Sequence, residues 1–168
     1  MNNYIMLNGK KIPLTDEQVK LIQPDMPEKS PFDRVKGGEL YYWACSDFSV
    51  NCTPEAEIIL DDGRFNAGNY CTDKDVMKQH ALHMKLNNLL WRYSMMHGGD
   101  SIDWYDLGAI KVNIYYNAET DELGTIDYSI IKHFGAVPFV SKETAKAAIE
   151  KIVKPFIAEH PDFDLKKM

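Results

Sequence analysis

The chain has 168 residues, of which 45% are hydrophobic and 26% are charged, as in a globular protein large enough to bury a core. Its net charge of −6 argues against a protein that coats nucleic acid, although a local basic patch is compatible with it. No apolar run approaches the ~20 residues that cross a bilayer, and the first residues lack signal-peptide character. The three cysteines favour reduced thiols over a disulfide framework. We therefore expect a cytoplasmic protein without membrane segments.

A hairpin and a short helix are predicted at the N-terminus. Asn8-Gly9 stands between two short apolar runs, a pattern typical of a tight β-hairpin over residues 4–12. Thr15 and Gln18 then match a capping box, in which each side chain binds the backbone amide of the other residue. This box predicts a short helix that ends near Ile22.

Residues 23–31 carry three prolines and no hydrophobic period, which is typical of a linker or of an extended segment laid over the surface. The linker divides the chain into a small N-terminal element, residues 1–30, and a main domain, residues 31–168. We expect the main domain to belong to the α+β class.

An aromatic β region is predicted at the start of the main domain. Phe32–Val35 and Glu39–Ala44 flank a Lys-Gly-Gly turn and favour a hairpin, because Tyr and Trp suit strands. Glu57–Leu60 predicts a further strand, which Asp61-Asp62-Gly63 would end.

A long helix is the strongest prediction in the sequence. Thr72 is the expected N-cap, and Asp73 and Asp75 place negative charge in the first turn, where the helix dipole favours it. No Gly or Pro follows until Gly98-Gly99, which favours a left-handed C-terminal cap. The predicted helix therefore fills the interval between Thr72 and Gly99.

The residues of this helix sort into distinct faces at about 100° per residue. Every lysine and arginine falls on one ridge, which consists of Lys74, Lys78, Lys85 and Arg92. Apolar side chains border the ridge on both sides, whereas an ordinary surface helix has one apolar stripe. The two flanks are Leu82, Leu86, Leu89, Leu90 and Tyr93, and Met77, Met84, Trp91 and Met95. We therefore expect a long central helix packed between the aromatic-rich N-terminal β region and a C-terminal β-β-β-α unit.

The C-terminal unit is predicted from two alternating segments and a final helix. Ile110–Tyr116 alternates apolar and polar residues like a half-buried strand, and Thr125–Ile131 is its expected partner. Gly135–Phe139 favours a short edge strand, because its proline cannot donate to a ladder. Ser141 should cap the last helix, which Pro155 should kink or end.

An acidic stretch and its aromatic neighbours are the leading candidates for a site. The segment from Asp100 to Asp127 contains seven acidic residues and one lysine. Their spacing matches neither an EF-hand nor a nuclease motif, so solvated acids or a face that docks on a basic protein are better interpretations than catalysis. Aromatic side chains in such a face would be natural anchors for a partner. The candidate partner-binding residues are Asp103, Trp104, Tyr105, Asp106, Asp121 and Glu122.

Other chemistry has weaker signals in the sequence. His80 and His83 are three residues apart on a helix, but a zinc site needs four ligands, and Cys45, Cys52, Cys71, His97 and His133 complete no recognised spacing. A polar seam in which both histidines bond Asn87 and Ser94 is the favoured alternative. Neither a nucleophile motif nor a phosphate-binding glycine loop is present. We therefore predict no metal, no cofactor and no enzymatic activity.

Several segments, taken in order, resemble a known group of proteins. They are Pro31-Phe-Asp-Arg-Val35, Gly38-x-x-Tyr-Tyr42, Asn69-Tyr70, Leu89-Leu-Trp-Arg-Tyr-Ser94, Gly98-Gly99, Ile102-Asp-Trp104, Val153-Lys-Pro-Phe156 and His160-Pro-Asp-Phe163. The chain from Phe32 onward resembles small proteins encoded on prophages and other mobile elements of gut Firmicutes. The resemblance implies a bacterial cytoplasm as the setting, and it implies no catalytic or binding residue.

Three hypotheses follow from the residues and this setting. Mobile elements often encode proteins that block host defences, anti-CRISPR proteins among them, so the first is a non-enzymatic inhibitor or adaptor that contacts a host protein or ribonucleoprotein. The alternative is a nucleic-acid-binding accessory protein whose basic ridge contacts phosphates. An enzyme of unrecognised type stays open as a third, because folds can carry sites that spacing does not reveal.

Overall fold

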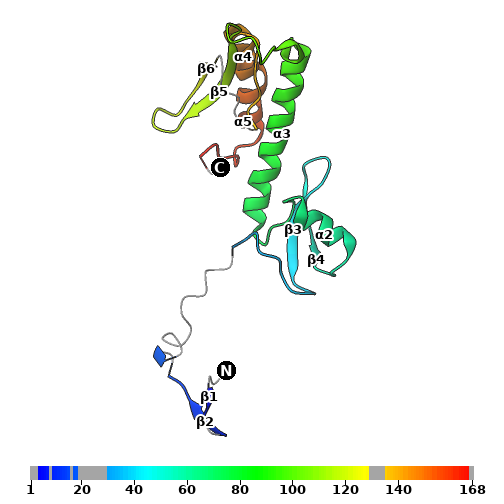
Figure 1. Cartoon of the computed structure of the whole chain (residues 1–168), viewed down its shortest axis with the longest axis vertical. Helices are drawn as coiled ribbons and strands as arrows, with labels where there is room; N and C mark the ends of the chain where they lie inside the picture. Colours follow the sequence, from blue (N-terminus) through cyan, green and yellow to red (C-terminus); the bar gives the residue numbers. More distant parts are fainter. Residues whose placement is uncertain (1–3, 8, 16, 19–29, 129–134, 167–168) are drawn as a thin grey trace.

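The protein is an α+β fold organised along one long helix. The computed structural model describes residues 4–7, 9–15, 17–18, 30–128 and 135–166. Helix α3 (Lys74–Met96) forms the axis of the main body. Strands β3 and β4 and helix α2 lie at its N-terminal end, and β5, β6, α4 and α5 lie beside its C-terminal part (Figure 1). We call residues 30–72 the N-terminal lobe and residues 111–166 the C-terminal unit.

Helix α3 confirms the predicted long helix, with its start one residue later. The N-cap is Asp73 rather than Thr72, because the Asp73 carboxylate accepts hydrogen bonds from the amides of Asp75 and Val76. The Thr72 hydroxyl instead donates to the carbonyl of Pro31. Gly98, with a φ of 91°, takes the left-handed conformation expected after the last turn.

Two apolar sides of α3 pack against the two parts of the body. Met77 and Ala81 join a buried cluster with the N-terminal lobe, and Met84 packs against it. Leu82 and Leu86 are buried in a second cluster with the C-terminal unit. The C-terminal helical segments contribute Val153 and Phe156 to this cluster, and the chain after α5 contributes Phe163. The flanks predicted from the sequence therefore have separate partners.

The methionine flank is least covered at Trp91. Trp91, which continues this flank, is 56% exposed, and Leu89 of the other flank is 39% exposed. The N-terminal lobe contacts α3 through the region of Met77 to Met84. Within this flank, Trp91 is therefore more exposed than Met77 and than the half-buried Met84 and Met95.

The N-terminal lobe differs from its predicted strand arrangement. Strand β3 (Leu40–Ala44) pairs antiparallel with β4 (Val50–Pro54), so that Tyr42 is opposite Cys52. The predicted partner, Phe32–Val35, forms turns and irregular chain instead. The hairpin prediction was therefore wrong in its first strand, and β4 was missed.

The predicted strand Glu57–Leu60 was also wrong, because helix α2 (Ile59–Asn66) begins there. The Asp61 carboxylate accepts hydrogen bonds from the amides of Ala56 and Ile58 and so satisfies donors at the helix start. A short apolar run cannot by itself distinguish a buried strand from a helix.

The C-terminal unit begins with an antiparallel pair. Strand β5 (Lys111–Asn117) pairs with β6 (Glu122–Tyr128), as predicted, although the strands approach the turn more closely than expected. The predicted edge strand Gly135–Phe139 is reduced to one bridge, between Phe139 and Val112. The last part of the predicted partner strand, residues 129–131, lies outside the described residues.

Three consecutive helical segments complete the C-terminal unit. They are α4 (Lys142–Ala148), the π turn η2 (Ile149–Val153) and α5 (Lys154–Glu159). Ser141 is the N-cap, as predicted, because its hydroxyl accepts the amide of Thr144. The helix does not end at Pro155, because this proline lies in the first turn of α5. A π turn precedes this proline, and such turns accommodate irregular backbone hydrogen bonding.

The predicted N-terminal hairpin is present and lies apart from the main body (Figure 1). Strand β1 (Tyr4–Leu7) pairs with β2 (Lys10–Pro13). The capping box is also confirmed, with distances of 3.0 Å and 3.2 Å between the amides and side-chain oxygens of Thr15 and Gln18. The predicted continuation to Ile22 and most of the linker lie outside the described residues.

Candidate functional site

Four of the six candidate partner-binding residues lie in one loop, residues 102–110. This loop joins η1 (Gly99–Ser101), which follows α3, to strand β5. The Asp103 carboxylate accepts the amide of Tyr105 at 2.8 Å, and the Asp106 carboxylate accepts the amide of Gly108 at 2.8 Å. Both acids therefore fold the loop through Asx turns, in addition to placing negative charge on its surface.

A buried lysine holds the base of the loop. Lys111 is 1% exposed, although its alternation pattern had predicted a polar position on the outer side of the strand. Its Nζ donates to the carbonyl of Asp106 at 2.5 Å and lies 5.9 Å from the centre of the Trp104 ring. The ammonium thus links strand β5 to the middle of the loop through a charge-assisted hydrogen bond and a cation–π contact.

The other end of the loop is fixed to the end of α3. Gly99 is buried, and a Cβ at this position would lie 2.8 Å from the backbone carbonyl of Ser94. The Ser94 hydroxyl in turn donates to the carbonyl of Pro138. The loop therefore rises from a closely packed junction between α3 and the segment that leads to Phe139.

The loop presents a large aromatic side chain to solvent. Tyr105 is 95% exposed, and its neighbours Leu107 and Ile110 are 65% and 59% exposed. Trp104 is half-buried at the base. An aromatic and apolar tip, edged by Asp103 and Asp106 and held at both ends, has the character of a binding anchor, because little conformational freedom is lost when it docks.

The remaining two candidates, Asp121 and Glu122, lie at the opposite end of β5. This strand spans seven residues, or about 23 Å, so the structure does not gather the acids into one face. Asp121 accepts a hydrogen bond from the Tyr116 hydroxyl and lies 3.5 Å from Lys166. The hydrogen bond, together with the charge of Lys166, holds the pKa of Asp121 below its usual value. Asp121 is therefore engaged with its own chain.

Asp121 and Glu122 border a groove of about 1240 Å³ between β6 and the C-terminal helices. Its lining combines apolar residues with side chains of both charge signs: Leu123, Ile149, Ile157, Phe163, Lys146, Lys154, Lys166, Glu150 and Asp164. Lys154 and Glu150 pair across one helical turn at 2.5 Å. The charges are thus largely balanced within the groove.

The basic ridge of α3 is partly covered by the C-terminal segment. Lys78 forms an ion pair with Asp162, and Lys85 lies 5.9 Å from the centre of the Phe156 ring. Lys74, Lys78 and Arg92 are exposed and Lys85 is half-buried, so the charge that is neutralised by an acid is that of Lys78. The ridge is therefore interrupted in its middle.

The two histidines of α3 take different roles from the predicted polar seam. The His83 ring packs 4.5 Å from the ring of Phe163, and burial lowers its pKa. Its Nε2 is buried without a hydrogen-bond partner, and Ser94 bonds Pro138 rather than a histidine. Within the described part of the chain, no three His, Cys, Asp or Glu side chains converge as a metal site would require.

A buried polar network in the N-terminal lobe was missed in the sequence. Glu55 is 2% exposed and accepts hydrogen bonds from Arg34 at 3.0 Å and from the Tyr70 hydroxyl at 2.8 Å. The Tyr70 ring stacks on Tyr41 with 4.0 Å between ring centres. The Tyr41 hydroxyl donates to Asp61, also 2% exposed, at 2.5 Å. The two buried acids are therefore joined through stacked tyrosines.

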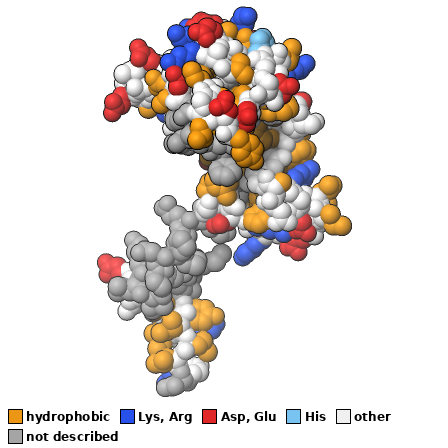
Figure 2. All heavy atoms as spheres, turned by 45° about the horizontal axis from the view of Figure 1, so that its top comes forward, with side chains coloured by type: hydrophobic (Ala, Val, Ile, Leu, Met, Phe, Trp, Pro, Cys, Tyr) orange, Lys and Arg blue, Asp and Glu red, His pale blue; other side chains and the backbone are white. Residues whose placement is uncertain are grey.

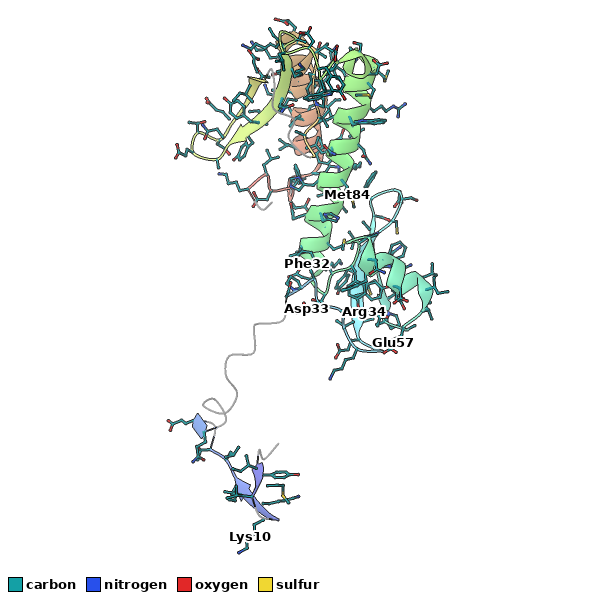
Figure 3. The ribbon with its side chains drawn as sticks, in the orientation of Figure 1. Lys10, Phe32, Asp33, Arg34, Glu57 and Met84 are labelled. Carbon is teal, nitrogen blue, oxygen red and sulfur yellow. The ribbon has the colours of Figure 1, made fainter. Side chains whose placement is uncertain are left out.

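The pKa values in this network follow from its hydrogen bonds. The Arg34 bonds lower the pKa of Glu55, and the Tyr41 bond lowers that of Asp61. Burial raises the pKa of Tyr70 to about 12. Because each acid has several hydrogen-bond donors, we interpret the network as one that stabilises the lobe internally. Figure 3 shows Arg34 within the lobe. No sequence pattern marks Glu55 or Asp61, since each lies in a stretch without regular periodicity.

Comparison with protein-family models, with curated proteins and with solved structures finds no match to this chain. Among the described residues, no helix has the length and apolar character needed to cross a membrane.

Proposed function

We propose that this protein acts by binding another protein, without catalysis, and that loop 102–110 is the contact surface. The observation that carries the proposal is the 95% exposure of Tyr105 on a loop that Lys111 and Gly99 hold in place. Exposed aromatic anchors on restrained backbone are characteristic of binding hot spots.

The chemistry of the loop favours a basic partner with an apolar pocket. Residues 102–110 contain Asp103 and Asp106 and no lysine, arginine or histidine. Proteins that handle nucleic acid carry basic surfaces that such acids would complement. We therefore propose that the target is a protein or ribonucleoprotein of a host defence or nucleic-acid-processing system. The resemblance to prophage-encoded proteins supports an inhibitory role of the anti-CRISPR kind in a bacterial cytoplasm.

The alternative, a nucleic-acid-binding accessory protein, has less support. It relies on the basic ridge, in which Lys78 is paired with Asp162 and Lys85 lies against Phe156. Lys78 is exposed but its charge is paired, and Lys74 and Arg92 are exposed at opposite ends of α3. Two separated cations neutralise few phosphates, so they would give weak binding.

The test compares capture of host proteins by three forms of the full chain in a nuclease-treated lysate. Tyr105→Ala with Leu107→Ser removes the anchor, and loss of a stoichiometric partner is expected. Asp103→Asn with Asp106→Asn keeps acceptors for the two turns while removing the charge, and weaker, less salt-dependent capture is expected. The matched control is Lys74→Glu with Arg92→Glu. The proposal fails if the control loses the partner while the Tyr105 variant retains it.

A further inference from the structure

Helix α2 turns its apolar side chains outward. Ile59 is 88% exposed and Leu60 is 64% exposed, whereas Asp61, on the inward side, is 2% exposed. A surface helix normally buries its apolar face and exposes its polar one. Here the polar network with Tyr41 and Arg64 holds the inward face, Phe65 packs against the Tyr70 ring, and Ile59 and Leu60 are left exposed.

The outward face of α2 is also smooth. Gly63 follows Ile59 by one helical turn, and nothing lies within 4 Å of where its Cβ would be. The neighbouring Ile58 is 50% exposed. Hydrophobic side chains are visible at the right edge of the body in Figure 2, where α2 lies. A contiguous apolar patch of this kind marks a docking surface.

The β1–β2 hairpin also exposes apolar side chains. Tyr4, Met6, Leu7 and Ile12 are 50%, 59%, 56% and 40% exposed. A two-stranded hairpin without a core is marginally stable in water. The hairpin lies apart from α2 of its own chain in Figures 1 and 2, and its apolar side chains form an isolated patch in Figure 2.

The charges of the two surfaces are opposite. The described hairpin residues carry Lys10 and Lys11 and no acid. The start of α2 carries the exposed acids Glu57 and Asp62, and Asp62 also pairs with Arg34 at 2.6 Å. Figure 3 shows Lys10 projecting from the hairpin tip and Glu57 on the side of the N-terminal lobe away from α3. An apolar, basic hairpin therefore matches an apolar, acidic helix face.

We propose that the β1–β2 hairpin of one molecule binds the α2 face of a second copy, and that the exchange is reciprocal. Each molecule has one hairpin and one α2 face, so two copies satisfy both surfaces around a two-fold axis. The hairpin face that carries Tyr4, Met6 and Lys11 covers Ile59 and Leu60, and Lys11 lies near Glu57. The product is a homodimer held by exchanged arms.

The test measures the molar mass of the full chain by light scattering on a sizing column at micromolar concentration. We expect a dimer for the natural sequence. Met6→Asp in the hairpin and Ile59→Asp in α2 each alter an exposed residue, and each variant alone should be monomeric. Leu89→Asp, on exposed α3 surface, is the matched control and should remain dimeric.

Mixing the two monomeric variants gives the decisive result. The Met6→Asp chain keeps an intact α2 face, and the Ile59→Asp chain keeps an intact hairpin. An equimolar mixture should therefore recover a dimer that contains one copy of each, held by one of the two contacts. The proposal is overturned if the natural chain is monomeric, if either variant alone remains dimeric, or if the mixture stays monomeric.

Discussion

Replacing Glu55 with glutamine should destabilise the N-terminal lobe through its hydrogen bonds alone, because the two side chains have nearly the same volume. One Glu55 oxygen accepts from Arg34 Nε and the Tyr70 hydroxyl, and the other accepts from Arg34 Nη2 and the amide of Glu57. Either orientation of a glutamine amide would turn an N–H group against two donors. The substitution therefore loses two hydrogen bonds in every rotamer.

The expected cost is about 3 kcal/mol of unfolding free energy. Hydrogen bonds to a charged group contribute roughly 1.5–3 kcal/mol each. The lower part of the combined range applies, because the Arg34 side chain is 34% exposed and can turn toward water. For a chain of this length, a loss of about 3 kcal/mol lowers the melting temperature by about 10 °C.

The loss should also depend on pH. The folded-state pKa of Glu55 is lowered by the Arg34 bonds, so its stabilisation is present above the ordinary glutamate pKa and fades as the pH falls through the folded value. Thermal unfolding followed by circular dichroism should therefore show the largest difference near neutral pH and a smaller one below about pH 4. Glu119→Gln, the same change on an exposed turn, is the control. Equal melting temperatures for Glu55→Gln and the control would refute the reasoning.

Two further predictions concern the residues that hold loop 102–110 in place. Gly99→Ala should lower the free energy of unfolding by about 1–3 kcal/mol, since its Cβ would meet the backbone of Ser94. The control Gly63→Ala in α2, with open space at its Cβ, should raise the free energy of unfolding by about 0.5–1 kcal/mol. Denaturant unfolding measures both, and equal effects would contradict the packing at Gly99. Lys111→Met should speed amide hydrogen exchange in loop 102–110 at least several-fold, because the bond to Asp106 is lost, and unchanged exchange there would contradict the anchoring role.

The features that the sequence predicted are those that depend on neighbouring residues along the chain. The α3 helix has caps, composition and a stop signal within its own segment, and its apolar flanks identified the two parts that it contacts. The Asn8-Gly9 turn and the Ser141 cap are similarly local. Even there, the choice between Thr72 and Asp73 as N-cap was wrong, because the Thr72 hydroxyl is taken by Pro31, far along the chain.

The missed features depend on contacts between distant residues. Helix α2 begins with Ile59 and Leu60 directly after Ile58, an apolar run that resembles a strand. Its helical start depends on Asp61, which the buried Tyr41 holds in place. Lys111 alternates like an outward residue but is buried because the loop carbonyl of Asp106 folds over it. The acids at the two ends of β5 form no common face, since the strand itself separates Asp106 from Asp121.

Site-specific photo-crosslinking from position 105 directly tests whether loop 102–110 contacts a host protein. A photoreactive phenylalanine in place of Tyr105 in the full chain would be irradiated in nuclease-treated host lysate, with the same group in place of Tyr115, which is 45% exposed on β5, as the control. We expect one discrete host protein to be crosslinked from position 105, to be competed by the unmodified chain, and not to be crosslinked from position 115. No crosslinked protein from position 105, or the same products from both positions, would contradict it.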